Sequence, residues 1–128
     1  YNGERWIAST LRSVLRQKKA PAEIVVVNDH STDRSAEIVA EFRGVRLVDN
    51  PEKGANPARR YGLALTTAPL VALLDQDDLW HPNHLAIQSH WLETRPLCRA
   101  IAGTECDINR TTPQPAWDLT DRRFTTCQ

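Results

Sequence analysis

Three carboxylates fall within four positions at Asp75-Gln76-Asp77-Asp78, directly after the apolar run Pro69–Leu74. A short, continuously apolar run predicts a strand that is buried on both faces, as in a parallel sheet. Open α/β sheets bind ligands at the carboxyl ends of their strands, which is where these acids would lie. Crowded carboxylates repel one another, and a divalent cation offsets this repulsion. The pattern therefore predicts a metal site with one open side.

Asp75 and Asp77 are the predicted ligands, and Mg²⁺ or Mn²⁺ is the predicted cation. Hard cations favour oxygen ligands, and Mg²⁺ commonly takes only one or two carboxylates, leaving other positions to substrate phosphates or water. Alternate side chains of an extended segment share one side, so Asp75 and Asp77 would point the same way. The alternative is that these acids start the next helix, where capping and the helix dipole favour carboxylates. That alternative fits Asp78 best.

A second acid, Asp29, follows the β-branched run Glu23–Val27. Parallel strands in one sheet would bring this acid and Asp75 to the same edge. One interpretation is a nucleoside pocket in which Asp29 accepts a hydrogen bond from a base or ribose. The other is a turn followed by a helix N-cap, which accounts well for Ser31–Asp33.

Two arginines, Arg59 and Arg60, stand at the predicted start of a helix. A helix N-terminus does not favour cations, so an anionic ligand near Arg59 explains its position better than the helix does. For Arg60 a solvated side chain is the favoured interpretation.

The elements that must position these residues alternate along the chain. Apolar periodicity and capping residues predict four helices, at Gly3–Gln17, Ser31–Phe42, Ala58–Thr67 and Pro82–Thr94. Apolar or β-branched runs predict three strands, at Glu23–Val27, Gly44–Val48 and Pro69–Leu74. This alternation predicts βαβ units, and hence an α/β fold with a mostly parallel sheet flanked by helices.

Composition narrows the function classes. Sixteen basic and sixteen acidic residues cancel over the 128 residues, which argues against a nucleic-acid surface or a polybasic anchor. No apolar run approaches the roughly 20 residues that a membrane-spanning helix needs. The Gly-rich signatures of the common nucleotide-binding loops are absent, and so are the motifs of Ser and Cys nucleophiles.

Four motifs in order carry a resemblance: YNGE at residues 1–4, VVVNDHSTD at 25–33, GANPARR at 54–60 and LLDQDDLWHP at 73–82. Together they resemble the family 2 glycosyltransferases of the GT-A fold. The resemblance implies a Rossmann-like nucleotide-diphospho-sugar transferase fold, present here as a single partial domain, 1–128. Residues 1–105 would form the nucleotide-sugar-binding half, and residues 106–128 would begin the acceptor region.

The resemblance also implies a function. A family 2 enzyme transfers a sugar from a nucleotide-diphospho-sugar donor to a saccharide or lipid-linked acceptor, usually with inversion and with Mg²⁺ or Mn²⁺. The residues that it implies for donor binding are Tyr1, Glu4, Asp29, Arg59 and Asp75. Tyr1 and Glu4 would lie beside the nucleoside and Asp29 at the base. Asp77, with Asp75, would ligate the metal on the diphosphate.

The chain departs from the family pattern at three positions. Asn28 replaces a usual Asp, Arg60 a usual Asn, and His30 a usual Gly. His30 would strain a turn that prefers positive φ. The family's first strand, which normally precedes Tyr1, is not in the sequence, and its general base would lie beyond residue 128. We therefore expect the isolated chain to bind donor without catalysing transfer.

Two other interpretations stay open. One is a non-catalytic nucleotide-binding or interaction domain that retains the fold. The other is a Mg²⁺-dependent phosphatase of the haloacid-dehalogenase type, which also places Asp-x-Asp after an apolar strand but expects it on the first strand. By analogy with polysaccharide-building family members, we expect a cytoplasmic protein, associated peripherally with the inner membrane face.

Overall fold

The computed structural model describes residues 1–95, 97 and 100. The chain divides into two compact units, residues 1–87 and 88–128, and every element that carries a candidate residue lies in the first. The acceptor region predicted for residues 106–128 lies outside the described residues, so the predicted division of the domain stays a prediction.

The predicted alternation of helices and strands is confirmed from residue 7 to residue 65. The helices are α1 (Ile7–Leu15), α2 (Ser35–Ala40), α3 (Ala55–Leu65) and α4 (His84–Glu93), of which α4 continues past residue 87. The strands are β1 (Ile24–Asn28) and β2 (Val45–Asp49), and they pair in parallel with Ile24 opposite Val45 and Asn28 opposite Asp49. The predicted α/β class with a parallel sheet flanked by helices is therefore correct.

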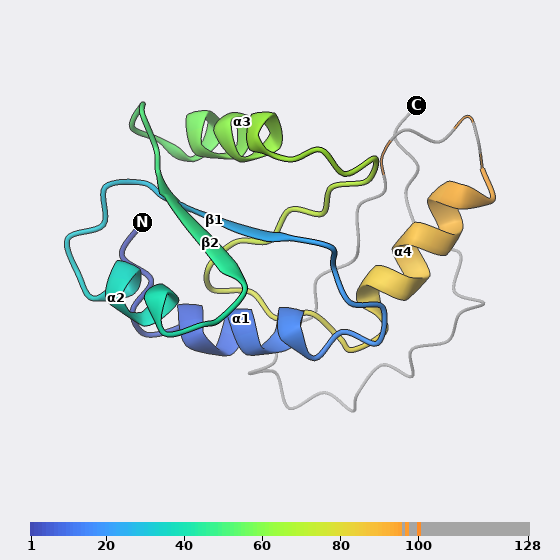
Figure 1. Ribbon diagram of the computed structural model, residues 1–128, viewed down its shortest axis with the longest axis horizontal. Helices are drawn as coiled ribbons and strands as arrows, with labels where there is room; N and C mark the ends of the chain where they lie inside the picture. The colour runs from blue at the N-terminus through green and yellow to red at the C-terminus, as the bar shows by residue number, and fades with distance from the viewer. Residues whose placement is uncertain (96, 98–99, 101–128) are drawn as a thin grey trace, which may run out of the picture. The chain divides into compact units, whose positions relative to one another are not determined.

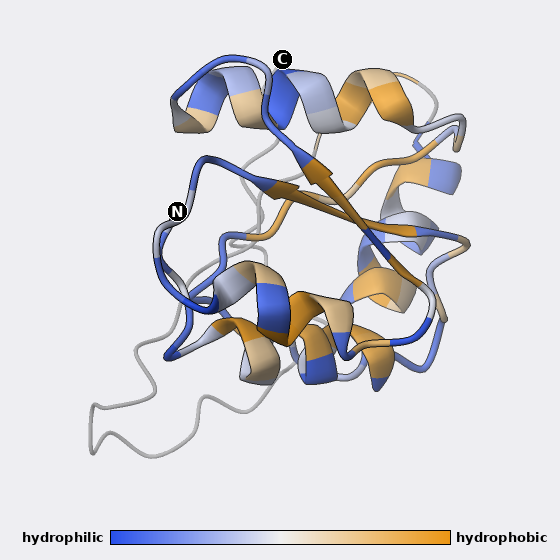
Figure 2. Ribbon diagram, turned by 60° about the vertical axis from the view of Figure 1, so that its left-hand side comes forward, coloured by the Kyte–Doolittle hydropathy of each residue, from blue (hydrophilic) through white to orange (hydrophobic). Residues whose placement is uncertain are grey.

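Helices cover both faces of this small sheet (Figure 1). On one face Ile7 and Leu11 of α1 and Val39 of α2 form the buried core, against which aliphatic residues of both strands pack. Both strands are mainly apolar (Figure 2), although Arg46 interrupts β2. On the other face α3 lies close to β1, because a Cβ atom added at Gly62 would come within 3.2 Å of Val27 Cγ2.

The predicted strand at Pro69–Leu74 is the one element that the structure contradicts. The segment has no strand assignment, and Leu70, Val71 and Leu73 are 44%, 43% and 54% exposed. A strand requires a neighbour for its backbone hydrogen bonds, and among residues 1–95 the sheet consists of β1 and β2 alone. The apolar composition is therefore that of a buried strand, but the local structure is irregular.

Polar side chains of α1, and that of Gln17 just beyond its end, fix the chain after this segment. Thr10 Oγ1 donates to the carbonyl of Gln76 at 2.8 Å, and Ser13 Oγ accepts from the Trp80 amide at 3.1 Å. Gln17 donates from Nε2 to the His81 carbonyl at 2.8 Å and accepts from the Leu85 amide at 3.0 Å. These contacts position the acidic residues by their backbone, without a strand.

Candidate functional site

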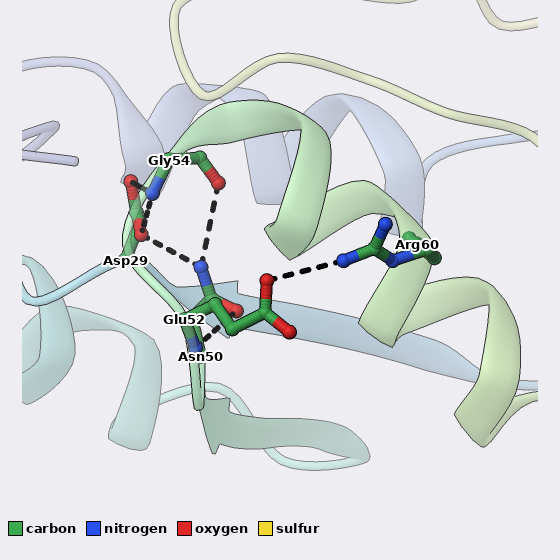
Figure 3. Close-up of polar contacts among 5 residues, drawn as sticks. All are labelled: Asp29, Asn50, Glu52, Gly54 and Arg60. Atoms are coloured by element: carbon green, nitrogen blue, oxygen red, sulfur yellow. Dashed lines mark hydrogen bonds and ion pairs between the residues drawn. The ribbon is translucent and has the colours of Figure 1, made fainter.

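Asp29, just beyond the end of β1, is held by the loop that follows β2 (Figure 3). Its Oδ1 accepts hydrogen bonds from Asn50 Nδ2 at 2.7 Å and from the Gly54 amide at 2.8 Å. The same Gly54 amide reaches Oδ2 at 3.0 Å. The bond from Asn50, followed by that from Gly54, lowers the pKa of Asp29 below its usual value. Asp29 is therefore an oriented carboxylate that remains ionised at neutral pH.

Gly54 makes this arrangement sterically possible. It immediately precedes α3, with φ 121° and ψ 153°, a conformation that is essentially restricted to glycine. Its amide points at Asp29 while its carbonyl accepts the Ala58 amide at 3.0 Å, a bond within the first turn of α3. The start of α3 is thereby attached to the end of β1.

Arg60 projects from α3 toward the solvent and forms an ion pair with Glu52 at 3.1 Å (Figure 3). Both side chains are largely exposed, so the pair contributes little to stability. The interpretation of Arg60 as a solvated side chain fits this geometry.

The first four residues are attached to the loop after β1 and to the first residue of α2. The Gly3 amide donates to Ser35 Oγ at 2.8 Å, and the Glu4 amide donates to Asp33 Oδ2 at 2.9 Å. The Glu4 carboxylate in turn accepts the Arg34 amide at 3.1 Å. Desolvation raises the pKa of Asp33, but its bonds from Ser35 and the Glu4 amide outweigh this and leave the pKa lowered. The chain near Tyr1 is thus fixed next to the loop that contains Asp29.

Two residues of this region have left-handed backbone conformations. His30 has φ 60° and Asn2 has φ 49°. The expectation that position 30 requires positive φ is confirmed, and His30 occupies it at a steric cost that glycine would not carry.

Two close approaches connect the N-terminal residues to other parts of the site. The ammonium of Lys53 lies 5.9 Å from the centre of the Tyr1 ring. On the other side, a Cβ atom added at Gly3 would lie 2.6 Å from Gln76 Cγ, so only glycine allows this approach. The N-terminal residues therefore lie between the loop that follows β2 and the acidic residues at 75–77.

Arg59 and Asp75 form an ion pair from α3 to the acidic residues. Arg59 Nη2 lies 2.8 Å from Oδ1 and 2.9 Å from Oδ2 of Asp75. The hydrogen bond and charge of Asp75 raise the pKa of Arg59 above its usual value. Because the side chains are 43% and 53% exposed, the pair is easily exchanged for contacts with a ligand.

The Asp77 carboxylate is exposed and has no hydrogen-bond or ion-pair partner among the described residues. Asp78 belongs to a turn in which its amide donates to the Asp75 carbonyl at 3.2 Å. Within residues 1–95, 97 and 100, no three His, Cys, Asp or Glu side chains gather closely enough to hold a metal ion. Asp75 and Asp77 are both accessible, and the metal site predicted for them stays a prediction.

Sequence reasoning did not single out several residues that build the site. Thr10 and Ser13 lie on α1 and Gln17 lies just beyond its end, and their spacing of three and four positions is the signal that could have identified them. Asn50 and Lys53 lie in a loop with no recognisable spacing pattern. Only the folded chain brings them to Asp29 and Tyr1.

Together these residues indicate which kind of ligand the site suits. Asn50 and Gly54 orient the Asp29 carboxylate. Lys53 supplies positive charge beside the N-terminal residues, and Arg59 supplies it beside the acidic residues 75–77. Such a combination suits a ligand that carries both hydrogen-bonding groups and phosphates.

Comparison with known proteins agrees with this chemistry. The family described as Glycosyl transferase family 2 matches residues 1–126. A similar Escherichia coli protein is the UDP-Glc:alpha-D-GlcNAc-diphosphoundecaprenol beta-1,3-glucosyltransferase WfgD, 37% identical over 91 residues, which are 69% of this chain and 36% of that protein. The E. coli enzyme WfaP, of the same description, is 33% identical over 100 residues, 76% of this chain and 40% of that protein.

A third relative is the glycosyltransferase GlyA of Streptococcus pneumoniae serotype 4, 34% identical over 112 residues. The match covers 84% of this chain but 15% of that protein. The chain thus spans well under half the length of the curated relatives that it matches.

Proposed function

The chain belongs to glycosyl transferase family 2, and from this premise we propose that it is mainly the donor-binding half of a glycosyltransferase. The complete enzyme transfers a sugar from a nucleotide-diphospho-sugar to an acceptor, with inversion and with Mg²⁺ or Mn²⁺. The observation that carries the proposal is the set of contacts that join Tyr1 to Lys53, Gly3 to Gln76 and Arg59 to Asp75.

In this proposal the nucleoside lies between the N-terminal residues and the loop after β1. Asp29 accepts a hydrogen bond from the base, and Tyr1 and Glu4 lie beside the nucleoside. The unused hydrogen-bonding capacity of Asp29 supports its role, since among the described residues its Oδ2 accepts only the Gly54 amide, which it shares with Oδ1. Its lowered pKa keeps this acceptor charged.

The diphosphate of the donor lies near Arg59 and the acidic residues. Arg59 exchanges the Asp75 carboxylate for a ligand phosphate, which is an equally suitable partner for a guanidinium. Asp75 then becomes available to the ribose or to the cation, and Asp77 ligates the cation. When bound, the cation supplies positive charge that stabilises the departing nucleoside diphosphate.

The acceptor and the cellular location follow by analogy. WfgD acts, by its description, on a diphosphoundecaprenol-linked sugar, and we infer a lipid-linked or saccharide acceptor for this chain's protein. The inferred place of action is the cytoplasmic side of the membrane, in the biosynthesis of a polysaccharide. No helix among the described residues has the length and apolar character to span a bilayer.

Binding of UDP to the purified chain tests the proposal, with and without Mn²⁺. We expect binding that requires the metal and is abolished in the Asp77→Ala variant. Glu37→Ala is the charge-matched control, because Glu37 is an exposed acid of α2 whose carboxylate forms an ion pair with Arg34. Metal-independent binding, or none, would instead support the non-catalytic binding domain. Release of phosphate from a generic monoester would support the phosphatase.

A further inference from the structure

Asn50 is almost completely buried, at 2% exposure, and lies between three separate parts of the first unit. Its side chain donates to Asp29 Oδ1 at 2.7 Å and reaches the Gly54 carbonyl at 3.4 Å. Its backbone amide donates to the Asn28 carbonyl at 2.8 Å, and its Oδ1 accepts the Glu52 amide at 3.4 Å. One amide group thus connects the end of β1, the loop after β2 and the start of α3 (Figure 3).

We propose that Asn50 is a positioning residue for donor binding, acting through the carboxylate of Asp29. This inference rests on the proposed function and deepens it. Without the Asn50 donor, the Gly54 amide would be the remaining donor to Asp29 among the described residues, and the carboxylate would be less firmly fixed. The acceptor offered to the nucleoside would then lose its fixed direction, and donor affinity would fall.

The position requires a neutral donor rather than any polar residue. A carboxylate at position 50 would place a second negative oxygen about 2.7 Å from Asp29 Oδ1. Two carboxylates at that distance share one proton, because like charges raise the pKa of one member of the pair. Below that raised pKa the shared proton restores one hydrogen bond and a single negative charge, as in the wild type. Above it the two carboxylates repel each other.

This reasoning makes Asn50→Asp a pH-dependent variant. We expect its UDP dissociation constant, measured with Mn²⁺, to be within about twofold of the wild type at low pH and about tenfold weaker at high pH, the size of one hydrogen bond to a charged group. The experiment titrates UDP into both proteins between about pH 5 and 8. The ratio of variant to wild type at each pH cancels the titration of the nucleotide's own phosphate, whose pKa is about 6.

The chain contains a matched control one residue before Asp29. Asn28 Nδ2 donates to Asp49 Oδ1 at 2.9 Å, so the Asn28→Asp variant creates the same like-charge pair between β1 and β2 without touching Asp29. We expect its UDP affinity to follow the wild type at every pH. The neutral variant Asn50→Ala should bind UDP about fivefold to tenfold more weakly at every pH, since it loses the same bond without adding charge.

The results of these titrations decide whether Asn50 has the proposed positioning role. Wild-type affinity of Asn50→Asp at high pH, or an equal pH-dependent loss in Asn28→Asp, would overturn the positioning role. If Asn50→Asp unfolds at high pH, as judged by circular dichroism, Asn50→Ala decides, and unchanged UDP affinity in that variant would overturn the role. A wild-type chain that fails to bind UDP with any metal would remove the proposed function and this inference with it.

Discussion

Two segments of this chain have the same pattern in the sequence and different structures. Ile24–Asn28 and Pro69–Leu74 are both apolar runs, and each is followed by an acid. The first is strand β1, paired with β2 and packed between helices, and the Asp29 that follows it is held by Asn50 and Gly54. The second is irregular and exposed, and of the acids after it Asp75 pairs with an arginine and Asp77 is exposed.

The difference shows what creates a pre-organised acid. Asp29 gains its direction from neighbours that the pairing of β1 with β2 brings close, so its geometry exists before any ligand binds. Asp75 and Asp77 are positioned only by backbone contacts to α1 and one exchangeable ion pair. In the proposed site, one half is therefore preformed and the other takes its final arrangement from the ligand.

The largest predicted effect is that of replacing Gly54, whose amide holds the Asp29 carboxylate. Gly54→Ala should lower the free energy of unfolding by about 2 kcal/mol, because φ 121° with ψ 153° is open only to glycine. Urea unfolding of the wild type and the variant measures this free energy. Gly44 is the matched control, with φ 80° and no atoms near the added Cβ, so Gly44→Ala should cost about 1 kcal/mol. Equal losses would show that the backbone conformation at Gly54 is no more demanding than that at Gly44.

The two apolar runs can be compared directly by truncation. Val26→Ala in β1 should cost about 1 kcal/mol or more, because Val26 packs against the buried core. Leu73→Ala should cost less than about 0.5 kcal/mol although it removes more atoms, since Leu73 is 54% exposed. Thermal unfolding of both variants measures the contrast. A larger loss for Leu73 would mean that the second run is packed like a strand after all.

Arg59→Gln should separate the two roles of the ion pair. The variant frees the Asp75 carboxylate, so Mn²⁺ should bind more tightly in the absence of nucleotide. The gain should be only about threefold, since an exposed ion pair contributes little. UDP should bind more weakly to the same variant, because the guanidinium that pairs with the phosphate is lost. Calorimetric titration of each ligand measures both changes. Changes in the same direction would contradict the exchange of Arg59 between carboxylate and phosphate.

The smallest predicted effect is the stability that Asp29 contributes to the fold and that is lost at low pH. The pKa of Asp29 is lower in the folded chain than its ordinary value of 3.8, so the carboxylate stabilises the fold above that value and this contribution is lost as the pH falls through the folded pKa. The unfolding free energies of wild type and Asp29→Asn should differ at pH 7 and converge in strong acid. A difference that stays constant down to the lowest pH would show that the Asp29 bonds do not depend on its charge.

Much of the fold was predictable from local pattern. The β-branched run at Ile24–Asn28 and the amphipathic spacing of α1 have few alternatives, and both elements were correctly predicted to within a few residues. The need for positive φ at position 30 was also predictable. The apolar run at Pro69–Leu74 was not, because a sequence pattern reports the apolar character of a strand but not the presence of a hydrogen-bonding neighbour.

By itself the sequence determined the α/β class, the family and the identities of the candidate acids and of Arg59, because these depend on residue type and local spacing. The tertiary structure alone decided that Asn50 and Gly54 hold Asp29 and that Arg59 pairs with Asp75. It also decided that α1, rather than a strand, fixes the acidic residues. The physical reason is that these contacts join residues remote in sequence, whose approach follows from packing and backbone pairing and not from any local preference.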